Sequence, residues 1–225
     1  MFNRHPYLNV LILFLGVIVI TGCVTGSSNE EEKRTFKTYT TENGLKKGQV
    51  YAIAGDRKGN VWFGYGINGG GLTKFDGAEW TTYTQDDGLQ SNYVYSITAD
   101  ASNTIWIGYG PSRSGLTSFD GSEWNTFTTE DGLPIERVYA LTSDPSGNIW
   151  IGFGPNAGGI VKYNGQNWTS FTESDGLPNN YVYSISSDRS GNVWIGFGPN
   201  AGGIVKYDGS SWRTYDKQDG LSKNY

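Results

Sequence analysis

The sequence predicts an all-β protein in which one short group of strands is repeated along the chain. Three observations support this prediction. Glycine accounts for 33 of the 225 residues, and it is a poor helix former. Aromatic residues make up 15% of the chain; they favour strands and supply enough buried surface to argue against disorder. Finally, the tripeptide Asp-Gly-Leu recurs at a constant spacing.

The N-terminus resembles a bacterial lipoprotein signal. An unbroken apolar run from Val10 to Ile20 is shorter than the roughly 20 residues that span a bilayer, and it fits the apolar part of a signal peptide. It leads into the residues ITGC, which resemble the lipobox that ends in a lipidated cysteine. The alternative is a short membrane anchor or a buried strand with an incidental thiol.

We therefore expect a signal peptide at 1–22, lipidation at Cys23 and a polar tether over 23–34. The lipid would make the membrane a partner and place the protein in the bacterial cell envelope. Val24 stands where an aspartate would signal retention at the inner membrane, so the outer membrane or the cell surface is favoured. The periplasmic side stays open as an alternative.

The repeat is 44 residues long and keeps its register throughout. Its leucines lie at regular intervals: Leu45, Leu89, Leu133, Leu177 and Leu221. All eight tryptophans fall into two series with the same spacing: Trp62, Trp106, Trp150 and Trp194, and Trp80, Trp124, Trp168 and Trp212. We expect these tryptophans to form a structural core, with ligand stacking as the less favoured alternative.

Each repeat resolves into four strands, as its last copy illustrates. We expect strands at 181–187, 193–197, 203–207 and 212–215, joined by turns rich in Asp, Asn and Gly and by a glycine-rich loop at 198–202. Both faces of these strands carry apolar residues, so neighbouring sheets must cover each other. Such sheets are β-propeller blades. They are expected within 35–225, at about 45–88, 89–132, 133–176 and 177–220.

The repeat resembles the two-component regulator propeller repeat. The resemblance is carried by GLPNNYVYSISSDRSGNVWIGFG, GGIVKYDG and a W-x-x-[YF] outer strand, and it extends over residues 35–225. It implies blades like those of seven-bladed rings in the periplasmic sensor regions of hybrid histidine kinases, some of which respond to oligosaccharides. The chain departs from that pattern because it carries no kinase or receiver sequence.

The repeats predict an incomplete or open ring. Residues 36–40 align with the outer strand at 80–84, and 221–225 match the start of a fifth inner strand, without the two middle strands between them. We interpret the sequence as a fragment of a longer protein. A small closed ring and an assembly between chains are the less favoured alternatives. Uncovered blade faces would promote self-association.

Variable positions between the repeats indicate a binding surface at one end of the blades. The candidates open the inner strands or lie in the glycine-rich loops: Gln49, Tyr93, Arg137 and Tyr181, and Asn68, Arg113, Asn156 and Asn200. These residue types suit stacking and hydrogen bonding to a polar ligand such as a glycan. The alternative is that they are merely solvated.

Composition argues against several other functions. The chain has one histidine, His5, and one cysteine, so removal of the signal peptide leaves no histidine for acid–base or metal chemistry. A formal charge of −5 argues against nucleic acid. Asp56, Asp100, Asp144 and Asp188 each lack a second carboxylate in calcium-ligand spacing and suit Asx turns better. We expect no catalytic residue, cofactor or metal.

Two other short motifs are interpreted as structural. Residues 64–69 fit G-x-G-x-x-G but precede a strand rather than a helix, which argues against a nucleotide site. Residues 186–194 resemble a sialidase Asp-box with one extra residue, and those boxes are turns.

Three function classes are consistent with these observations. The leading prediction is a lipid-anchored binding module for a glycan or an envelope protein, without enzymatic activity. The second is an accessory sensor that presents its ligand to a separate transducer. The third, less favoured, is an enzyme similar to streptogramin-inactivating propeller lyases, which rely on a histidine and a bound metal.

Overall fold

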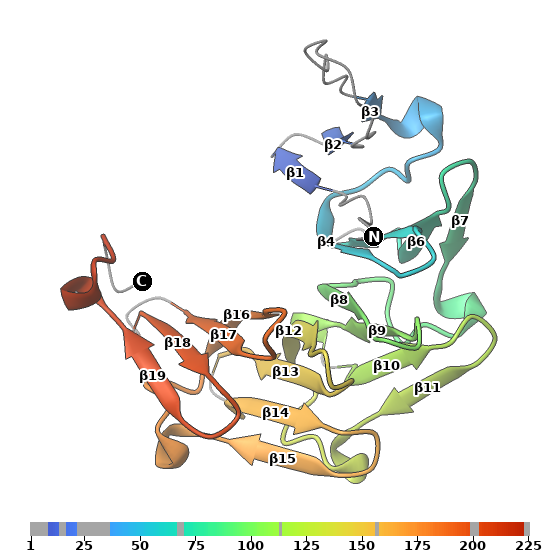
Figure 1. Ribbon diagram of the computed structural model, residues 1–225. Helices are drawn as coiled ribbons and strands as arrows, with labels where there is room; N and C mark the ends of the chain where they lie inside the picture. The colour runs from blue at the N-terminus through green and yellow to red at the C-terminus, as the bar shows by residue number, and fades with distance from the viewer. Residues whose placement is uncertain are drawn as a thin grey trace, which may run out of the picture.

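The computed structural model describes residues 9–13, 17–21, 37–66, 70–112, 114–155, 158–198 and 203–222 (Figure 1). Every regular element within these ranges is a strand or a single turn of 3₁₀ helix. The predicted all-β class is therefore confirmed. No helix in the described ranges is long and apolar enough to cross a membrane.

Four antiparallel sheets of four strands each form the blades. Blade 1 contains β4 (Val50–Gly55), β5 (Val61–Tyr65), β6 (Leu72–Phe75) and β7 (Trp80–Tyr83), and blade 2 contains β8 (Ser96–Ala99), β9 (Ile105–Gly108), β10 (Leu116–Phe119) and β11 (Trp124–Phe127). Blade 3 contains β12 (Val138–Ser143), β13 (Ile149–Phe153), β14 (Ile160–Tyr163) and β15 (Trp168–Phe171), and blade 4 contains β16 (Val182–Ser187), β17 (Val193–Phe197), β18 (Ile204–Tyr207) and β19 (Trp212–Tyr215). In blade 4 the second and fourth strands match the predicted bounds, and the first and third begin one residue later.

The blades follow one another in an open arc that does not close into a ring (Figure 1). The first strands of successive blades, β4, β8, β12 and β16, lie side by side on the inner side of the arc. Blades 1 and 4 form its two ends. The predicted open arrangement of propeller blades is confirmed for the described residues.

Apolar side chains fill the space between neighbouring blades. Trp62 of blade 1 lies edge-on against Phe119 of blade 2, with ring centroids 6.3 Å apart. The same contact recurs between Trp106 and Tyr163, at 5.9 Å. These tryptophans are buried, whereas Trp194, at the same position on the outward face of blade 4, is half-buried. The difference arises because no further blade covers that face in the described structure.

The second tryptophan series stacks within its own blade and is half-buried. Phe119 and Trp124 have centroids 4.0 Å apart, and Tyr163 and Trp168 are 4.1 Å apart. Each of these two tryptophans also contacts an aromatic ring on the outer strand of the preceding blade. The ring centroids of Trp124 and Tyr83, for example, are 5.7 Å apart. Both series therefore join neighbouring blades.

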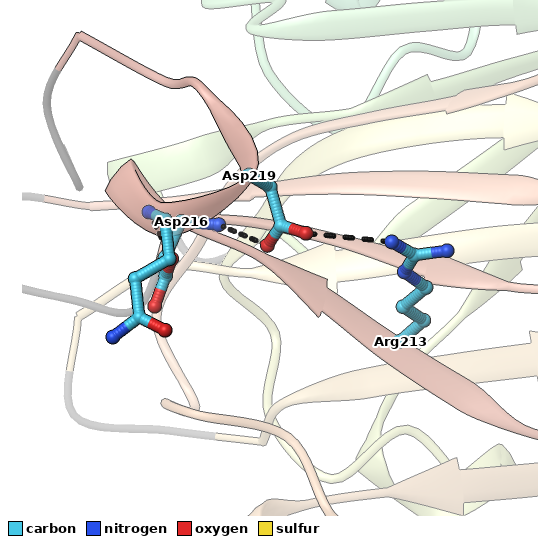
Figure 2. Close-up of polar contacts among 4 residues, drawn as sticks. Arg213, Asp216 and Asp219 are labelled. Carbon is cyan, nitrogen blue, oxygen red and sulfur yellow. Dashed lines mark hydrogen bonds and ion pairs between the residues drawn. The ribbon is translucent and has the colours of Figure 1, made fainter.

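One 3₁₀ turn that was not predicted from the sequence precedes each blade, and another follows blade 4. The turns are η1 (Thr41–Asn43), η2 (Gln85–Asp87), η4 (Thr129–Asp131), η5 (Glu173–Asp175) and η6 (Lys217–Asp219). The residue before each turn and the third residue within it form a capping box. Figure 2 shows η6, where Asp219 Oδ2 accepts from the Asp216 backbone N at 3.1 Å and Asp219 Oδ1 pairs with Arg213 Nη2 at 3.4 Å.

The tripeptide Asp-Gly-Leu, or Asn-Gly-Leu at 43–45, ends each turn and returns the chain to the core. Its glycine takes φ between 98° and 119°, a left-handed conformation that L side chains rarely adopt. The leucine that follows is buried at Leu45, Leu89, Leu133 and Leu177, and Leu221 is half-buried. A 3₁₀ turn of another kind, η3 (Gly110–Ser112), lies in the loop between β9 and β10.

The apolar N-terminal run forms strands, which were expected from the sequence only as an alternative to a signal peptide. β1 (Asn9–Leu13) and β2 (Val17–Thr21) make a hairpin, and β2 pairs with β3 (Lys37–Tyr39). The strand at 36–40 therefore has neighbouring strands, but they come from the N-terminal residues and not from a blade shared with 221–225. A run rich in Val, Ile and Leu suits a strand as well as a signal peptide, and β3 offers a free edge for pairing.

β3 nevertheless keeps the outer-strand position that its alignment predicts. The ring centroid of Tyr39 lies 5.1 Å from that of Phe75 and 5.7 Å from that of Trp80. Tyr83 contacts the corresponding two rings of blade 2 in the same way. The signal peptide stays a prediction, and cleavage before Cys23 would remove β1 and β2. Cys23 and the tether at 23–34 lie outside the described residues.

Candidate functional site

Two kinds of connection occupy the two ends of the strands. At one end, Asx turns join the first strand of each blade to the second, and the backbone N of Arg57 donates to Asn103 Oδ1 of the next turn at 2.8 Å. At the other end, the 3₁₀ turns meet the loops that follow β5, β9, β13 and β17. The backbone N of Gly71 donates to the Asn92 carbonyl there at 3.2 Å. We call this second end the loop end.

The structure places four of the eight predicted ligand residues at the loop end, at the start of the inner strands. Gln49 is exposed, and Tyr93, Arg137 and Tyr181 are half-buried. The hydroxyl of Tyr51 donates to Gln49 Oε1 at 3.4 Å and its ring contacts Tyr93, which links Gln49 to Tyr93. The other four candidates lie outside the described residues: Asn68, Arg113, Asn156 and Asn200.

The site contains a second set of tyrosines that was not predicted from the sequence. They recur at 44-residue spacing, at Tyr51, Tyr139 and Tyr183 within the inner strands and at Tyr95 directly before β8. Together with Tyr93 and Tyr181 they form what we call the tyrosine row. Successive ring centroids lie 4.7 to 6.4 Å apart: Tyr51–Tyr93, Tyr51–Tyr95, Tyr93–Tyr95, Tyr95–Tyr139, Tyr139–Tyr181 and Tyr181–Tyr183. The row therefore connects all four blades.

In three blades, the tyrosine shared by all four repeats lies at a β-bulge. The register between the first and second strands shifts between Val50 and Ala52, and again between Val138 and Ala140. Tyr51 and Tyr139 are the extra residues at these shifts, and Tyr183 is the extra residue in blade 4. A bulge re-aims the side chain of its extra residue. The 44-residue recurrence of tyrosine at this position is the signal by which the set could have been found.

Glycines provide the surface on which the rings lie. A Cβ added at Gly110 would come within 3.0 Å of the Tyr95 side chain, and one at Gly154 would meet the Tyr139 ring equally closely. In blade 4 the ring over Gly198 belongs to Tyr181. Tyr183 therefore does not cover the glycine of its own blade, and its side chain is 58% exposed.

Three hydroxyls of the row stay protonated well above neutral pH. Burial, followed by the neighbouring phenol groups, raises the pKa of Tyr93 and of Tyr95 to about 12. The pKa of Tyr181 is raised for the same reasons. The row therefore presents aromatic faces together with neutral hydroxyl groups that donate and accept hydrogen bonds.

Arg137 is the one cation among the four candidate residues that open the inner strands; the others are tyrosine or glutamine. Its Nε is buried and has no hydrogen-bond partner among the described residues. Arg137 also makes no ion pair within the described part of the chain. No acidic side chain in the described ranges therefore neutralises this half-buried guanidinium.

The repeated aspartates serve the turns at the opposite end. Asp144 accepts from the backbone N of Ser146 and of Asn148 at 2.9 Å, and its Oδ2 accepts from Trp150 Nε1 at 2.9 Å. Asp56, Asp100 and Asp188 repeat this pattern. No group of three or more His, Cys, Asp or Glu side chains in the described ranges is placed to hold a metal ion.

Comparison with known proteins identifies the repeat. The family described as "Two component regulator propeller" matches residues 44–66, 88–110, 132–154 and 176–198. Each segment contains one of the invariant tyrosines and the glycine at the end of the second strand. The predicted repeat family is therefore confirmed for these segments. No curated protein matches the chain.

Solved structures share the fold. The extracellular domain of the hybrid two component system BT3049 from B. thetaiotaomicron is 22% identical, with a TM-score of 0.60 over 86% of this chain and 28% of its own. That of the one component system BT4673 is 19% identical, with a TM-score of 0.58 over 92% and 30%. YCF48 bound to D1 peptide is 13% identical, with a TM-score of 0.57 over 91% and 66%. The chain thus spans less than a third of the first two structures.

Proposed function

We propose that this chain, which carries four two-component regulator propeller repeats, is an extracytoplasmic binding module. It is anchored in the cell envelope by a lipid on Cys23 and takes a polar ligand, such as a glycan or an envelope protein, at the loop end of its blades. Binding, rather than catalysis, is its role. Two solved structures with this fold are described as extracellular domains, which supports the location.

The observation that carries the proposal is the tyrosine row. Six tyrosines from four blades share one surface, and Tyr51 and Tyr183 are 39% and 58% exposed. Exposed aromatic surface is costly unless it meets a partner, and tyrosine combines contact area with a hydrogen-bonding group. Ring-to-ring contacts alone would explain buried tyrosines, but they do not explain the exposure of Tyr51 and Tyr183 at the two ends of the row.

A glycan array and pull-downs from envelope extract test the proposal. The intact chain should retain at least one ligand class, and Tyr183→Ala should weaken retention by about tenfold, the loss expected for one aromatic contact. Tyr215→Ala, on the outer strand of the same blade, is the matched control and should bind as the unchanged chain does. Blank results in both assays would overturn the proposal.

The lipid anchor has a separate test. Metabolic labelling with a fatty acid should mark the chain, and Cys23→Ala should abolish the label and release the protein from the membrane fraction. Retention of label by the variant would show that Cys23 is not the attachment site.

An accessory sensor is the second candidate. It would present its ligand to a separate transducer, and the description of BT3049 as a hybrid two component system favours such a sensory role. Deleting the gene should then alter transcripts that respond to polysaccharides. Turnover of a substrate by the purified chain, surviving a chelator, would instead favour the enzyme alternative.

A further inference from the structure

The surfaces by which neighbouring blades pack repeat one pattern along the arc. Each of the first three blades turns a tryptophan of its second strand and an aromatic ring of its fourth strand towards the next blade: Trp62 and Tyr83, Trp106 and Phe127, and Trp150 and Phe171. We call this the forward face of a blade, and the opposite surface its rear face. On the rear face of the next blade, the fourth-strand ring meets a pair of aromatic rings, with centroids 5.2 to 5.7 Å away.

Blade 4 has a forward face without a partner blade. Trp194, Ile204 and Tyr215 repeat the positions that form this face in blades 1 to 3. The third-strand position is fully buried in those blades, whereas Ile204 is 37% exposed. Among the described residues, the ring contact of Tyr215 is with Trp194 of its own blade, at 5.6 Å. This face therefore has the groups that a rear face receives, and no rear face lies on it in the described structure.

Blade 1 has a rear face of the matching kind, and β3 occupies it. Phe75 and Trp80 form its ring pair, with centroids 4.4 Å apart, and Phe63 beside them is fully buried. Tyr39 lies against this pair at the distances at which a fourth-strand ring lies on the other blades. Figure 1 places β3 on the side of blade 1 that faces away from blade 2. A three-residue strand thus holds the place of a blade's fourth strand, and a complete blade would have to displace it.

Charge favours the rear face of blade 1 over a second blade 4 as the partner of this forward face. The four strands of blade 4 carry Lys206 and Arg213 and no acidic residue, so two such faces packed together would bring like charges into one interface. The rear face of blade 1 is apolar, as at Phe63 and Phe75. An apolar rear face accepts a lysine: Lys162 holds the position of Lys206 in blade 3 and lies 5.5 Å from the tryptophan ring there, although blade 4 covers that face.

We propose that the forward face of blade 4 packs on the rear face of blade 1 in a second copy of this chain, in the place of β3, and that two chains close in this way into one ring. A contact between two different surfaces gives a closed ring when its rotation closes. Two chains supply eight blades, within the four to eight that propellers typically have. In Figure 1 the arc is open on one side, with blades 1 and 4 at the margins of the opening.

Burial of apolar surface drives the exchange. Tyr215 of one chain takes over the ring contacts that Tyr39 makes in the other, so these contacts are kept. Trp194 and Ile204 are removed from water as well, which stabilises the pair. The displaced strand exposes little that is new, because Lys37 and the residue after it are already exposed. The second contact of a closed ring forms within one particle, so the two contacts reinforce each other.

Sedimentation velocity and light scattering on the full chain measure the assembly. The mass should rise with concentration to twice that of the monomer and then stay constant. Tyr215→Ala removes the ring that enters the second copy, and it should raise the concentration at half-association at least tenfold. Thr214→Ala is the matched control, because Thr214 is the exposed neighbour on the other face of β19, and it should leave this concentration unchanged.

Tyr39→Ala should have the opposite effect. It removes the ring that competes for Phe75 and Trp80, so the concentration at half-association should fall at least tenfold. Pairing of two blade 4 faces would be insensitive to this change. Aggregation through a loosened N-terminus would give particles without a fixed size, whereas the closed ring keeps twice the monomer mass. Adding Ile204→Lys to Tyr39→Ala should return the chain to the monomer.

A mixture of two blocked variants tests which surfaces meet. The double variant Tyr39→Ala/Ile204→Lys has an open rear face and a blocked forward face, whereas Trp80→Ala has a damaged rear face and an intact forward face. Each variant alone should stay monomeric at a concentration at which the equimolar mixture forms a one-to-one pair. Thermal unfolding followed by circular dichroism checks that both variants are folded.

Four results would overturn the inference. They are a monomer at every concentration in both the unchanged chain and Tyr39→Ala, a mass that keeps rising beyond two chains, a Tyr39→Ala variant that associates no more strongly than the unchanged chain, and a mixture of the two blocked variants that stays monomeric. Ligand binding at the loop end is measured separately, so these results leave the proposed binding function as it stands.

Discussion

One carboxylate in each tight turn organises the blade around it. Asp144 satisfies two backbone donors, the Asn148 side-chain amide at 2.8 Å and the indole N–H of Trp150. A buried indole N–H without a partner would cost about 1–3 kcal/mol. The Asx turn thus does two things: it closes the hairpin and holds the tryptophan that faces the next blade. The turn was predicted from the sequence, but its bond to the indole was not.

The same turn in blade 4 predicts a dependence of stability on pH. Hydrogen bonds from Asn192 and Trp194 to Asp188 lower its pKa from 3.8 to about 2. The unfolded chain therefore binds the proton more readily, and the stabilisation present above pH 4 is lost as pH falls through 2. Urea unfolding followed by tryptophan fluorescence should show the free energy of unfolding decreasing across this interval.

Asp188→Asn should remove part of that decrease and lower stability at pH 7. Asp86→Asn is the matched control, because Asp86 is exposed and accepts no hydrogen bond within the described ranges. It should leave the pH dependence unchanged. An identical slope in Asp188→Asn and the unchanged chain would contradict the assignment.

We expect Arg137 to lower the stability of the fold at a position that is a candidate for ligand binding. Tyrosine holds the same position in blades 2 and 4, whereas Arg137 leaves a buried Nε without a hydrogen bond among the described residues. Arg137→Tyr should raise the free energy of unfolding by about 0.5–1 kcal/mol, as repeat-consensus substitutions commonly do. Urea titration measures this. Gln49→Tyr is the control, and because Gln49 is exposed it should change the free energy of unfolding less. A lower free energy of unfolding in Arg137→Tyr would show instead that Arg137 supports the fold.

At the scale of the element, the 3₁₀ turn couples each blade to the next. The capping box fixes the turn, the left-handed glycine ends it, and the leucine enters the core between two blades. In Thr128–Leu133 all three parts occur within six residues. The T-x-x-D-G-L pattern could have predicted the turn, because a capping box has a recognisable spacing.

The leucine of this element should contribute strongly to stability. Leu133→Ala should lower the free energy of unfolding by about 2–5 kcal/mol, because it leaves a cavity between blades 2 and 3. Urea unfolding provides the measurement. The same change at half-buried Leu221 should cost clearly less. Equal costs would contradict the view that the next blade is what buries this leucine.

The strands were more predictable than the site they carry. Strand types, their order and their alternation are local patterns, so Val193–Phe197 and Trp212–Tyr215 could be bounded from sequence. The tyrosine row depends on a bulge, in which an extra residue interrupts the two-residue period. Alternation alone would assign Tyr139 to a sheet face, and only the register of β12 against β13 shows otherwise.

At the scale of the whole molecule, blade 4 has an uncovered face at one end of the described arc. Leu72, Leu116 and Ile160 hold the same position in blades 1 to 3 and are fully buried, whereas Ile204 of blade 4 is 37% exposed. Trp194 and Tyr215 on this face are half-buried, and the Lys206 ammonium lies 5.6 Å from the Trp194 ring. Long basic side chains shield part of the apolar surface, but they do not replace a neighbouring sheet.

This face should make the chain self-associate. Sedimentation velocity over a range of concentrations should show a species larger than the monomer, because apolar sheet faces are stabilised when they are covered. Ile204→Lys places a second ammonium group beside Lys206 and should raise the association midpoint by at least tenfold. Thr169→Lys, on the exposed outer strand of blade 3, adds the same charge elsewhere and should leave association unchanged. Equal shifts in the two variants would indicate that net charge, rather than the blade 4 face, controls association, and a monomer at every concentration would contradict the prediction altogether.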